Sequence, residues 1–210
     1  MKAIDKFTAA MAELPLVAIL RGLKPAEAAE IGDMLAEAGF RLIEVPLNSP
    51  QPFDSIATLR KRLPQAVIGA GTVLTAAEVR DVAQAGGELV VAPNFERDVV
   101  AETVRLGMVS LPGIMTPTEA FAALAAGAHG LKLFPAEIAS PAVVKALLAV
   151  LPKGTKIVPV GGVGADNLGP WRAAGAAGFG LGSSLYKPGD DAATVRAKAA
   201  AIVSAFRRSS

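Results

Sequence analysis

Residues 16–46 read LVAILRGLKPAEAAEIGDMLAEAGFRLIEVP and contain one complete strand–helix–strand unit. The apolar run at 16–20 is typical of a buried strand, and residues 25–37 carry apolar side chains at helical spacing. A second apolar run at 40–46 follows the helix closely, so we expect the two strands to lie parallel. This unit predicts an α/β protein built on a parallel sheet.

The pattern of the first unit repeats down the chain. Strand-like runs occupy 16–20, 40–46, 66–70, 88–91, 107–111, 129–134, 156–160 and 177–181. Helical spacing occurs between them, at 25–37, 50–62, 75–84, 96–105, 117–126, 140–150, 165–173 and 191–206. Eight such units predict a closed (β/α)8 TIM barrel, formed as a single domain by residues 1–210. A doubly wound sheet is the alternative, but it needs fewer strands, and no GxGxxG motif opens the first helix.

The ends of the helices carry recognisable signals. Residues 1–15 have the pattern of an amphipathic N-terminal helix and not of a signal peptide. N-cap hydroxyls are expected from Thr75, Thr116 and Ser140. Left-handed C-caps are expected from the glycines that follow helices: Gly39, Gly86, Gly107, Gly127 and Gly175.

The composition excludes several classes of site. Hydrophobic residues make up 52% of the chain, and the net charge is +2 without a Lys/Arg stripe that could follow a phosphate backbone. The chain has no cysteine, and His129 is its one histidine. Disulfides, thiolate nucleophiles, cysteine zinc sites and histidine triads are therefore excluded. We expect no metal, no nucleic acid partner, no membrane span and a cytoplasmic location.

Charged residues at the carboxyl ends of the strands point to a site, because barrel active sites lie there. Strand alternation in residues 129–135 (HGLKLFP) places Lys132 on the face of Gly130 and Phe134, toward the barrel interior. A desolvated lysine has a lowered pKa and can act as a neutral amine nucleophile. A lysine that reaches out of the strand end, or that forms a structural ion pair, is the alternative.

Three other strand ends carry candidates. Glu44 lies late on the strand at 40–46, where it could exchange protons with Lys132 or simply pair with it. Arg21 ends the first strand and could bind a carboxylate through two hydrogen bonds, or could be solvated. Thr72 ends the third strand, where its hydroxyl could bind a substrate oxygen or shape a turn.

Two glycine-rich turns follow the seventh and eighth strands. They read VGGV at 160–163 and GLGSS at 180–184. Loops in these two places frequently bind phosphate in barrels, because glycines let backbone N–H groups approach the anion. Ser183 or Ser184 could add a hydroxyl donor. His129 falls on the helix-facing side of its strand and is expected to be structural.

Eight short motifs together resemble one known family. They are AILRG at 18–22, EVPLNSP at 44–50, GAGTVL at 69–74, APN at 92–94, PG…TPTEA at 112–120, LKLFPAE at 131–137, VGGV at 160–163 and GLGSSLY at 180–186. In this order they span essentially the whole chain and resemble the KDPG/KDPGal aldolases. The resemblance implies a homotrimeric barrel that cleaves a 2-keto-3-deoxy-6-phospho sugar acid to pyruvate and D-glyceraldehyde 3-phosphate, without metal or organic cofactor.

The resemblance also implies a role for each candidate. Lys132 matches the Schiff-base lysine and Glu44 matches the acid/base glutamate. Arg21 and Thr72 match residues that bind the pyruvyl carboxylate end. The residues that match the phosphate site are Gly161, Gly162, Gly182 and Ser183.

Two features are similar to the galactonate branch of this family, whose substrate differs at C4. Val160 stands where the gluconate branch carries threonine, and Asn48 and Ser49 stand where it carries Arg-Thr. We therefore expect Val160 to face C4, and Asn48 and Ser49 to contact the galactonate epimer. A gluconate-branch (KDPG) aldolase, a phosphate-binding epimerase or decarboxylase, and a non-catalytic sugar-phosphate sensor are the competing hypotheses.

Overall fold

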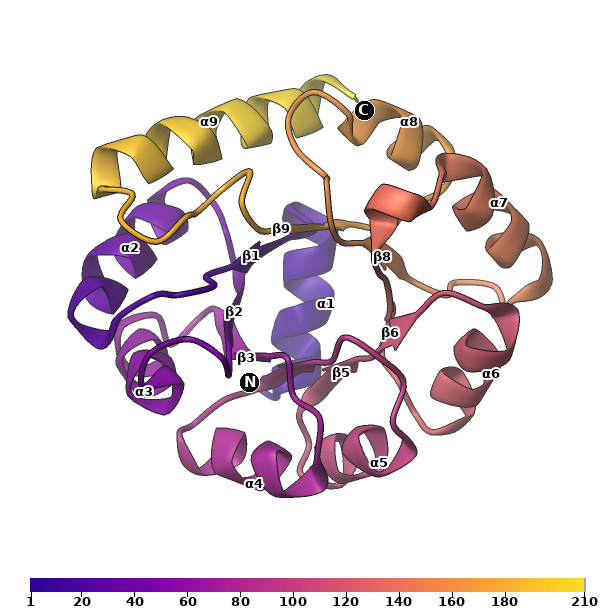
Figure 1. Cartoon of the computed structure of the whole chain (residues 1–210), viewed down its shortest axis with the longest axis horizontal. Coiled ribbons are helices and arrows are strands. Elements are labelled where there is room, and N and C mark those ends of the chain that lie inside the picture. The colour runs from indigo at the N-terminus through magenta and orange to yellow at the C-terminus, as the bar shows by residue number, and fades with distance from the viewer. Residues whose placement is uncertain (210) are drawn as a thin grey trace.

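The computed structural model describes residues 1–209, in which strands and helices alternate. The strands are β1 (Leu16–Ile19), β2 (Leu42–Pro46), β3 (Val67–Gly71), β4 (Leu89–Val91), β5 (Val109–Leu111), β6 (Gly113–Ile114), β7 (Leu131–Leu133), β8 (Ile157–Pro159) and β9 (Phe179–Leu181). The helices are α1 (Ala3–Glu13), α2 (Pro25–Glu37), α3 (Pro52–Arg62), α4 (Ala76–Gln84), α5 (Arg97–Arg105), α6 (Pro117–Ala125), the 3-10 helix η1 (Ala136–Ile138), α7 (Pro141–Val150), α8 (Leu168–Ala173) and α9 (Ala192–Arg208). Figure 1 shows the strands as a central ring, with α2 to α9 around it.

Parallel pairing closes the ring at every position. The strand order is β5-β4-β3-β2-β1-β9 on one side and β6-β7-β8 on the other. Only Pro112, which has no N–H to donate, separates β5 from β6, so these are two parts of one strand. A parallel bridge between Val160 and Gly180 joins the end of β8 to β9. The predicted eight-stranded barrel is therefore confirmed over the described residues, with its fifth strand in two pieces.

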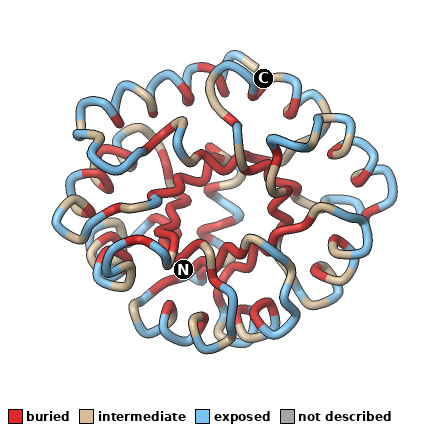
Figure 2. Tube along the Cα trace, in the orientation of Figure 1, coloured by how far each residue is buried: buried red, intermediate tan, exposed pale blue. Residues whose placement is uncertain are grey.

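The strands separate an inner layer of side chains from an outer one. Ile43, Leu131 and Leu133 belong to the outer layer, where they pack with residues of the helices. Because side chains alternate along a strand, the neighbouring Glu44 and Lys132 face the inside of the barrel. Figure 2 shows the ring buried almost throughout and each surrounding helix buried mainly along its inner edge.

Helix α1 covers the amino-terminal end of the barrel and lies behind the ring in Figure 1. Its Phe7 is buried against the interior side chains of the strands, including Val17 and Leu42. Lys6 of the same helix pairs with Glu88, just before β4, at 2.9 Å. With this end filled, the carboxyl ends of the strands form the open mouth of the barrel.

The predicted caps are confirmed at two of three helix starts. The hydroxyls of Thr75 and Thr116 accept backbone hydrogen bonds at the starts of α4 and α6. Ser140 occupies the N-cap of α7, but its side chain makes no capping bond. The Val143 N–H donates to the Ser140 carbonyl at 2.9 Å instead. All five predicted C-cap glycines have positive φ.

Every helix within residues 1–209 is too short or too polar to span a bilayer.

Candidate active site

Lys132 lies in the middle of β7 and points into the barrel. The residue is only 5% exposed, and it lines both the interior chamber and the mouth of the barrel. Its Nζ atom lies 4.7 Å from the centroid of the Phe134 ring, which caps it on the mouth side of the strand. The strand alternation read from the sequence is therefore correct here.

Glu44 occupies the corresponding place on β2. It is 1% exposed, and its Oε2 atom has no hydrogen-bond partner in the described part of the chain. The carboxyl group lies against Gly71 of β3, where a Cβ atom would stand only 1.3 Å from Oε2. Gly71 thus makes the space in which this buried carboxyl group fits.

A small interior chamber brings the two charged residues together. It has a volume of about 10 Å³ and is lined by Glu44 and Lys132 together with apolar side chains such as Ile19, Val158 and Val160. Across residues 1–209 no N···O distance within 4.0 Å joins the lysine to the glutamate. The two groups therefore face one chamber without forming a direct ion pair.

Burial shifts both groups toward their uncharged forms. Desolvation raises the pKa of Glu44 to about 7, although the charges of Lys132 and Arg21 oppose this shift. Desolvation also lowers the pKa of Lys132, with the charge of Arg21 adding to the shift and Glu44 opposing it. A free amine beside a protonated carboxyl group is a nucleophile next to its proton donor.

The mouth of the barrel contains a cavity of about 640 Å³ between the ends of β1, β7, β8 and β9. Seven of the nine predicted site residues line it, namely Arg21, Lys132, Val160, Gly161, Gly162, Gly182 and Ser183. Glu44 faces this cavity from the barrel interior, through the chamber that it shares with Lys132. The predicted residues thus gather at one end of the barrel.

The turn after β8 exposes backbone donors to this cavity. Gly161 and Gly162 have φ values of +107° and +64°, which favour glycine. Within residues 1–209 the N–H groups of Gly162 and Ser183 donate to no backbone or side-chain acceptor. Asn167 holds the turn by donating to the Gly162 carbonyl at 2.8 Å. Unused donors of this kind form a ready anion site.

The two serines of the turn after β9 differ in their hydrogen bonds. Ser184 donates its hydroxyl hydrogen to the Val163 carbonyl at 2.7 Å and so ties the two glycine-rich turns together. No such bond engages the Ser183 hydroxyl in the described chain, which leaves it available to a ligand in the mouth cavity. The structure therefore separates two residues that the sequence left equivalent.

Asn48 and Ser49 do not contact the mouth cavity, which corrects the expected role of these residues. The Asn48 Oδ1 atom accepts from Arg21 Nη1 at 2.7 Å. The Ser49 hydroxyl oxygen accepts from the Gly22 N–H at 2.9 Å, and Ser49 is buried. Both residues hold the turn after β1, so they orient Arg21 and do not line the cavity beside Val160.

Thr72 lies at the end of β3, as predicted, but it lines neither the chamber nor the mouth cavity. Its φ of +58° places it in the left-handed region, which is strained for a β-branched residue. Such strain is frequent at functional positions. Thr72 follows Gly71 directly, so its backbone stands beside the pocket of Glu44.

His129 is structural, as expected from its position in the strand. Its Nδ1 atom accepts from the Ser110 N–H at 3.0 Å. Burial and the nearby Lys156 charge lower its pKa, and the residue lines neither the chamber nor the mouth.

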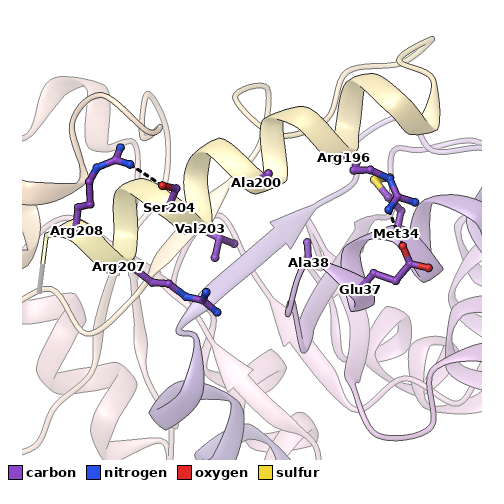
Figure 3. A pocket seen from close by; sticks show the side chains of 9 residues that line it. All are labelled: Met34, Glu37, Ala38, Arg196, Ala200, Val203, Ser204, Arg207 and Arg208. Carbon is purple, nitrogen blue, oxygen red and sulfur yellow. Dashed lines mark hydrogen bonds and ion pairs between the residues drawn. The ribbon is translucent and has the colours of Figure 1, made fainter.

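A second hollow of about 590 Å³ lies on the outside of the barrel between α2 and α9 (Figure 3). Its rim contains the Arg196–Glu37 ion pair at 2.8 Å, and Arg208 donates to the Ser204 hydroxyl. None of the predicted site residues lines it. The candidate chemistry belongs to the mouth of the barrel and not to this outer groove.

Three residues of the site were missed from the sequence. Phe134 already lay on the predicted face of Lys132, so alternation could have identified it. Gly71 carries no distinguishing signal, because its role depends on the neighbouring strand. Glu137 lies on η1, after β7, and lines the mouth cavity. Strand alternation does not predict the direction of a side chain that lies outside a strand.

Comparisons with known proteins agree on one family. Residues 7–198 match the family described as KDPG and KHG aldolase. A Rhizobium meliloti (strain 1021) protein named probable 2-dehydro-3-deoxy-6-phosphogalactonate aldolase is 51% identical over 204 residues, which cover 97% of this chain and 96% of that protein. The 2-dehydro-3-deoxy-6-phosphogalactonate aldolase of Escherichia coli (strain K12) is 47% identical over 197 residues, covering 93% and 96%.

The fold agrees with the sequence comparison. A solved structure described as native KDPGal superposes with a TM-score of 0.92 at 45% identity, covering 94% of this chain and 96% of that chain. The family match covers most of the chain and includes the strands that carry Lys132 and Glu44. The chain therefore belongs to the KDPG and KHG aldolase family and is an aldolase, a carbon–carbon lyase.

Proposed function

We propose that this protein is a class I aldolase that cleaves 2-dehydro-3-deoxy-6-phospho-D-galactonate to pyruvate and D-glyceraldehyde 3-phosphate through a Schiff base on Lys132. The observation that carries the proposal is the buried pair of Lys132 and Glu44, which face one chamber without an ion pair. Both sequence relatives described above bear the phosphogalactonate name.

The reaction begins with attack of the neutral Lys132 amine on the C2 carbonyl of the substrate. The resulting carbinolamine loses its oxygen as water after Glu44 donates a proton to it, and an iminium forms. Glu44, now a carboxylate, can accept the next proton. A carboxyl group with a pKa of about 7 suits both directions of proton transfer near neutral pH.

Carbon–carbon cleavage follows from the iminium. Glu44 removes the proton of the C4 hydroxyl, the C3–C4 bond breaks, and its electron pair moves into the iminium to give an enamine. D-glyceraldehyde 3-phosphate leaves as the aldehyde. Glu44 returns the proton to C3, water adds to the iminium, and pyruvate is released with regeneration of the Lys132 amine.

Two groups of residues in the mouth cavity suit the two anionic groups of this substrate. Arg21 binds the carboxylate in the proposal, and Asn48 orients the guanidinium. Thr72, which does not line the cavity, is proposed to contact the same end of the substrate. The phosphate takes the unused N–H groups of the turns after β8 and β9. The residues of this phosphate subsite are Gly161, Gly162, Gly182 and Ser183.

Val160 lies between the chamber and the glycine turn, and it is 7% exposed. A substrate that joins Lys132 to the phosphate subsite passes this side chain near C4. Valine offers no hydrogen bond to the C4 oxygen, so in the proposal the pocket loses a preference for the gluconate epimer, while valine by itself creates none for the galactonate epimer. The protein is further proposed to be a cytoplasmic homotrimer without a nucleic acid partner.

Borohydride reduction in the presence of pyruvate tests the covalent step. A lysine imine becomes a stable secondary amine under these conditions, so the protein gains the mass of the reduced pyruvyl group. Peptide mapping is expected to place the label on Lys132, and trapping should persist in EDTA because the imine itself is the electron sink. A label on Lys145, Lys153 or Lys156 would contradict the assignment, and no label would favour a non-catalytic sugar-phosphate sensor.

A further inference from the structure

The 3-10 helix η1 holds a carboxylate against the glycine turn of the mouth cavity. The Ala136 N–H donates to the Val160 carbonyl at 2.9 Å, which fixes the start of η1 to the end of β8. A Cβ atom on Gly161 would lie 2.0 Å from Glu137 Oε2, and one on Gly162 would lie 2.8 Å from Glu137 Cγ. The Glu137 side chain therefore lies along the surface that these two glycines leave open.

Glu137 forms no ion pair in that position within residues 1–209. Across residues 1–209 its carboxylate accepts no hydrogen bond and has no cation within 4.0 Å. The side chain is exposed and lines the mouth cavity. The adjacent N–H group of Gly162 is likewise unused. A negative group thus lies beside the donors that suit a second negative group.

We propose that Glu137 sets the affinity of the phosphate subsite as an internal, displaceable anion, an inference that rests on the proposed function. The carboxylate lies on the glycine turn when the subsite is empty, and it turns toward solvent when a phosphate enters. Two anions that share one partly enclosed cavity repel each other strongly unless they separate. Each phosphate-bearing ligand therefore binds more weakly than the backbone donors alone would allow, and it dissociates faster.

The alternative role for Glu137 is direct recognition of the sugar, with the carboxylate accepting a hydrogen bond from a substrate hydroxyl. The two roles predict opposite results when the charge is removed. A displaceable anion weakens the binding of every phosphate ligand, including inorganic phosphate, which has no sugar hydroxyl. A hydroxyl acceptor strengthens the binding of the sugar substrate alone. Loss of this acceptor therefore raises KM and leaves the affinity for phosphate unchanged.

The test compares the full-length wild type with Glu137→Gln, which keeps the shape of the side chain and removes its charge. The dissociation constant of inorganic phosphate is measured by calorimetry, and KM is measured for the phosphorylated substrate. Both are expected to fall by the same factor, about tenfold, because the repulsion belongs to the carboxylate and not to the ligand. Glu13→Gln at the end of α1 removes the same charge at the opposite end of the barrel and should match the wild type.

The outcomes separate this inference from the proposed function. An unchanged or higher phosphate dissociation constant in Glu137→Gln, with normal binding to the wild type, would refute the role of Glu137 alone. A rise in KM without a change in phosphate affinity would identify the hydroxyl acceptor instead. If phosphate bound to neither protein, or if Gly162→Asp did not weaken it, the phosphate subsite and the inference would both fail.

Discussion

At the scale of single residues, the site depends on two ionisable groups whose uncharged forms are favoured by burial. Glu44 and Lys132 are each almost fully enclosed, yet neither neutralises the other through a direct contact. A structural pair would be expected to form the short ion pair that is missing here. Their arrangement is better suited to moving a proton than to stabilising the barrel.

Replacement of Glu44 by glutamine is therefore expected to lower kcat by roughly 10²–10⁴-fold, the usual contribution of a general acid–base group. The wild-type pH profile of kcat/KM should contain a limb near pH 7 that comes from Glu44. This limb should disappear in Glu44→Gln. A variant that kept the limb would show that another group titrates in the site.

The pH dependence of the free energy of unfolding, compared between the wild type and Glu44→Gln, gives an independent test of the raised Glu44 pKa. The pKa of Glu44 is higher in the folded protein than its ordinary value of 4.5, so the folded state holds the proton more tightly. The contribution of Glu44 to the free energy of unfolding is complete below pH 4.5 and is lost as the pH rises through about 7. The wild type should lose roughly 3 kcal/mol relative to Glu44→Gln across this window, as measured by urea unfolding.

Val160 is the residue on which the choice of epimer can be tested. Threonine has almost the same shape, and its hydroxyl would add a hydrogen bond to the C4 oxygen in the gluconate configuration. One such bond corresponds to about 1–3 kcal/mol, so Val160→Thr should raise kcat/KM for the gluconate epimer by roughly tenfold. The measurement is kcat/KM for both epimers on both proteins. A wild type that prefers the gluconate epimer would overturn the branch assignment but not the aldolase chemistry.

At the scale of elements, the turn after β8 connects fold and function. Its positive φ angles require residues that tolerate left-handed backbone, and the same geometry leaves the Gly162 N–H unpaired. The side chain of Asn167 fixes the turn, and Ser184 links it to the turn after β9. These contacts hold the proposed anion site in place without a ligand.

Gly162→Asp is expected to raise KM for the phosphorylated substrate by at least tenfold, because it adds a negative charge to the anion site. The matched control is Gly162→Asn, which has nearly the same shape and also tolerates positive φ, but carries no charge. Steady-state kinetics on phosphorylated and unphosphorylated substrates would measure the effect. An equal loss on both substrates, or an equal loss in both variants, would place the phosphate elsewhere.

At the scale of the whole molecule, the closed barrel leaves no unpaired sheet edge within residues 1–209, so we expect subunit contacts to use helices and loops. Large apolar side chains remain exposed on this outer surface, on α6, η1 and α7. They are Phe121, Ile138 and Val150. Exposed apolar side chains of this size suit a subunit interface, which covers them in an oligomer.

Light scattering after gel filtration is expected to give a mass three times that of the 21.3 kDa chain. Burial of apolar surface between subunits would stabilise the closed, cyclic arrangement that the resemblance implies. A protein that ran as a monomer at micromolar concentration would contradict the trimer. The residues that line the mouth cavity all come from one chain, so activity in a monomer would not contradict the aldolase assignment.

Local sequence patterns were enough to predict the barrel, its N-terminal helix, and the position of Lys132 and Glu44 inside it. Hydrophobic periodicity is a local property, and the alternation of side chains along a strand follows from backbone geometry. The same reasoning placed both glycine-rich turns at the open end. Its errors at this level are small, such as the division of the fifth strand at Pro112 and the missing cap from Ser140.

Contacts between side chains from distant segments could not be predicted from these local patterns. Asn48 and Ser49 proved to hold the turn after β1, and Glu137 proved to lie on the glycine turn, because these contacts join segments far apart in the sequence. The pKa shifts of Glu44 and Lys132 also arise from burial by many strands at once. Long-range packing and desolvation depend on the closed barrel, and no local pattern of residues contains them.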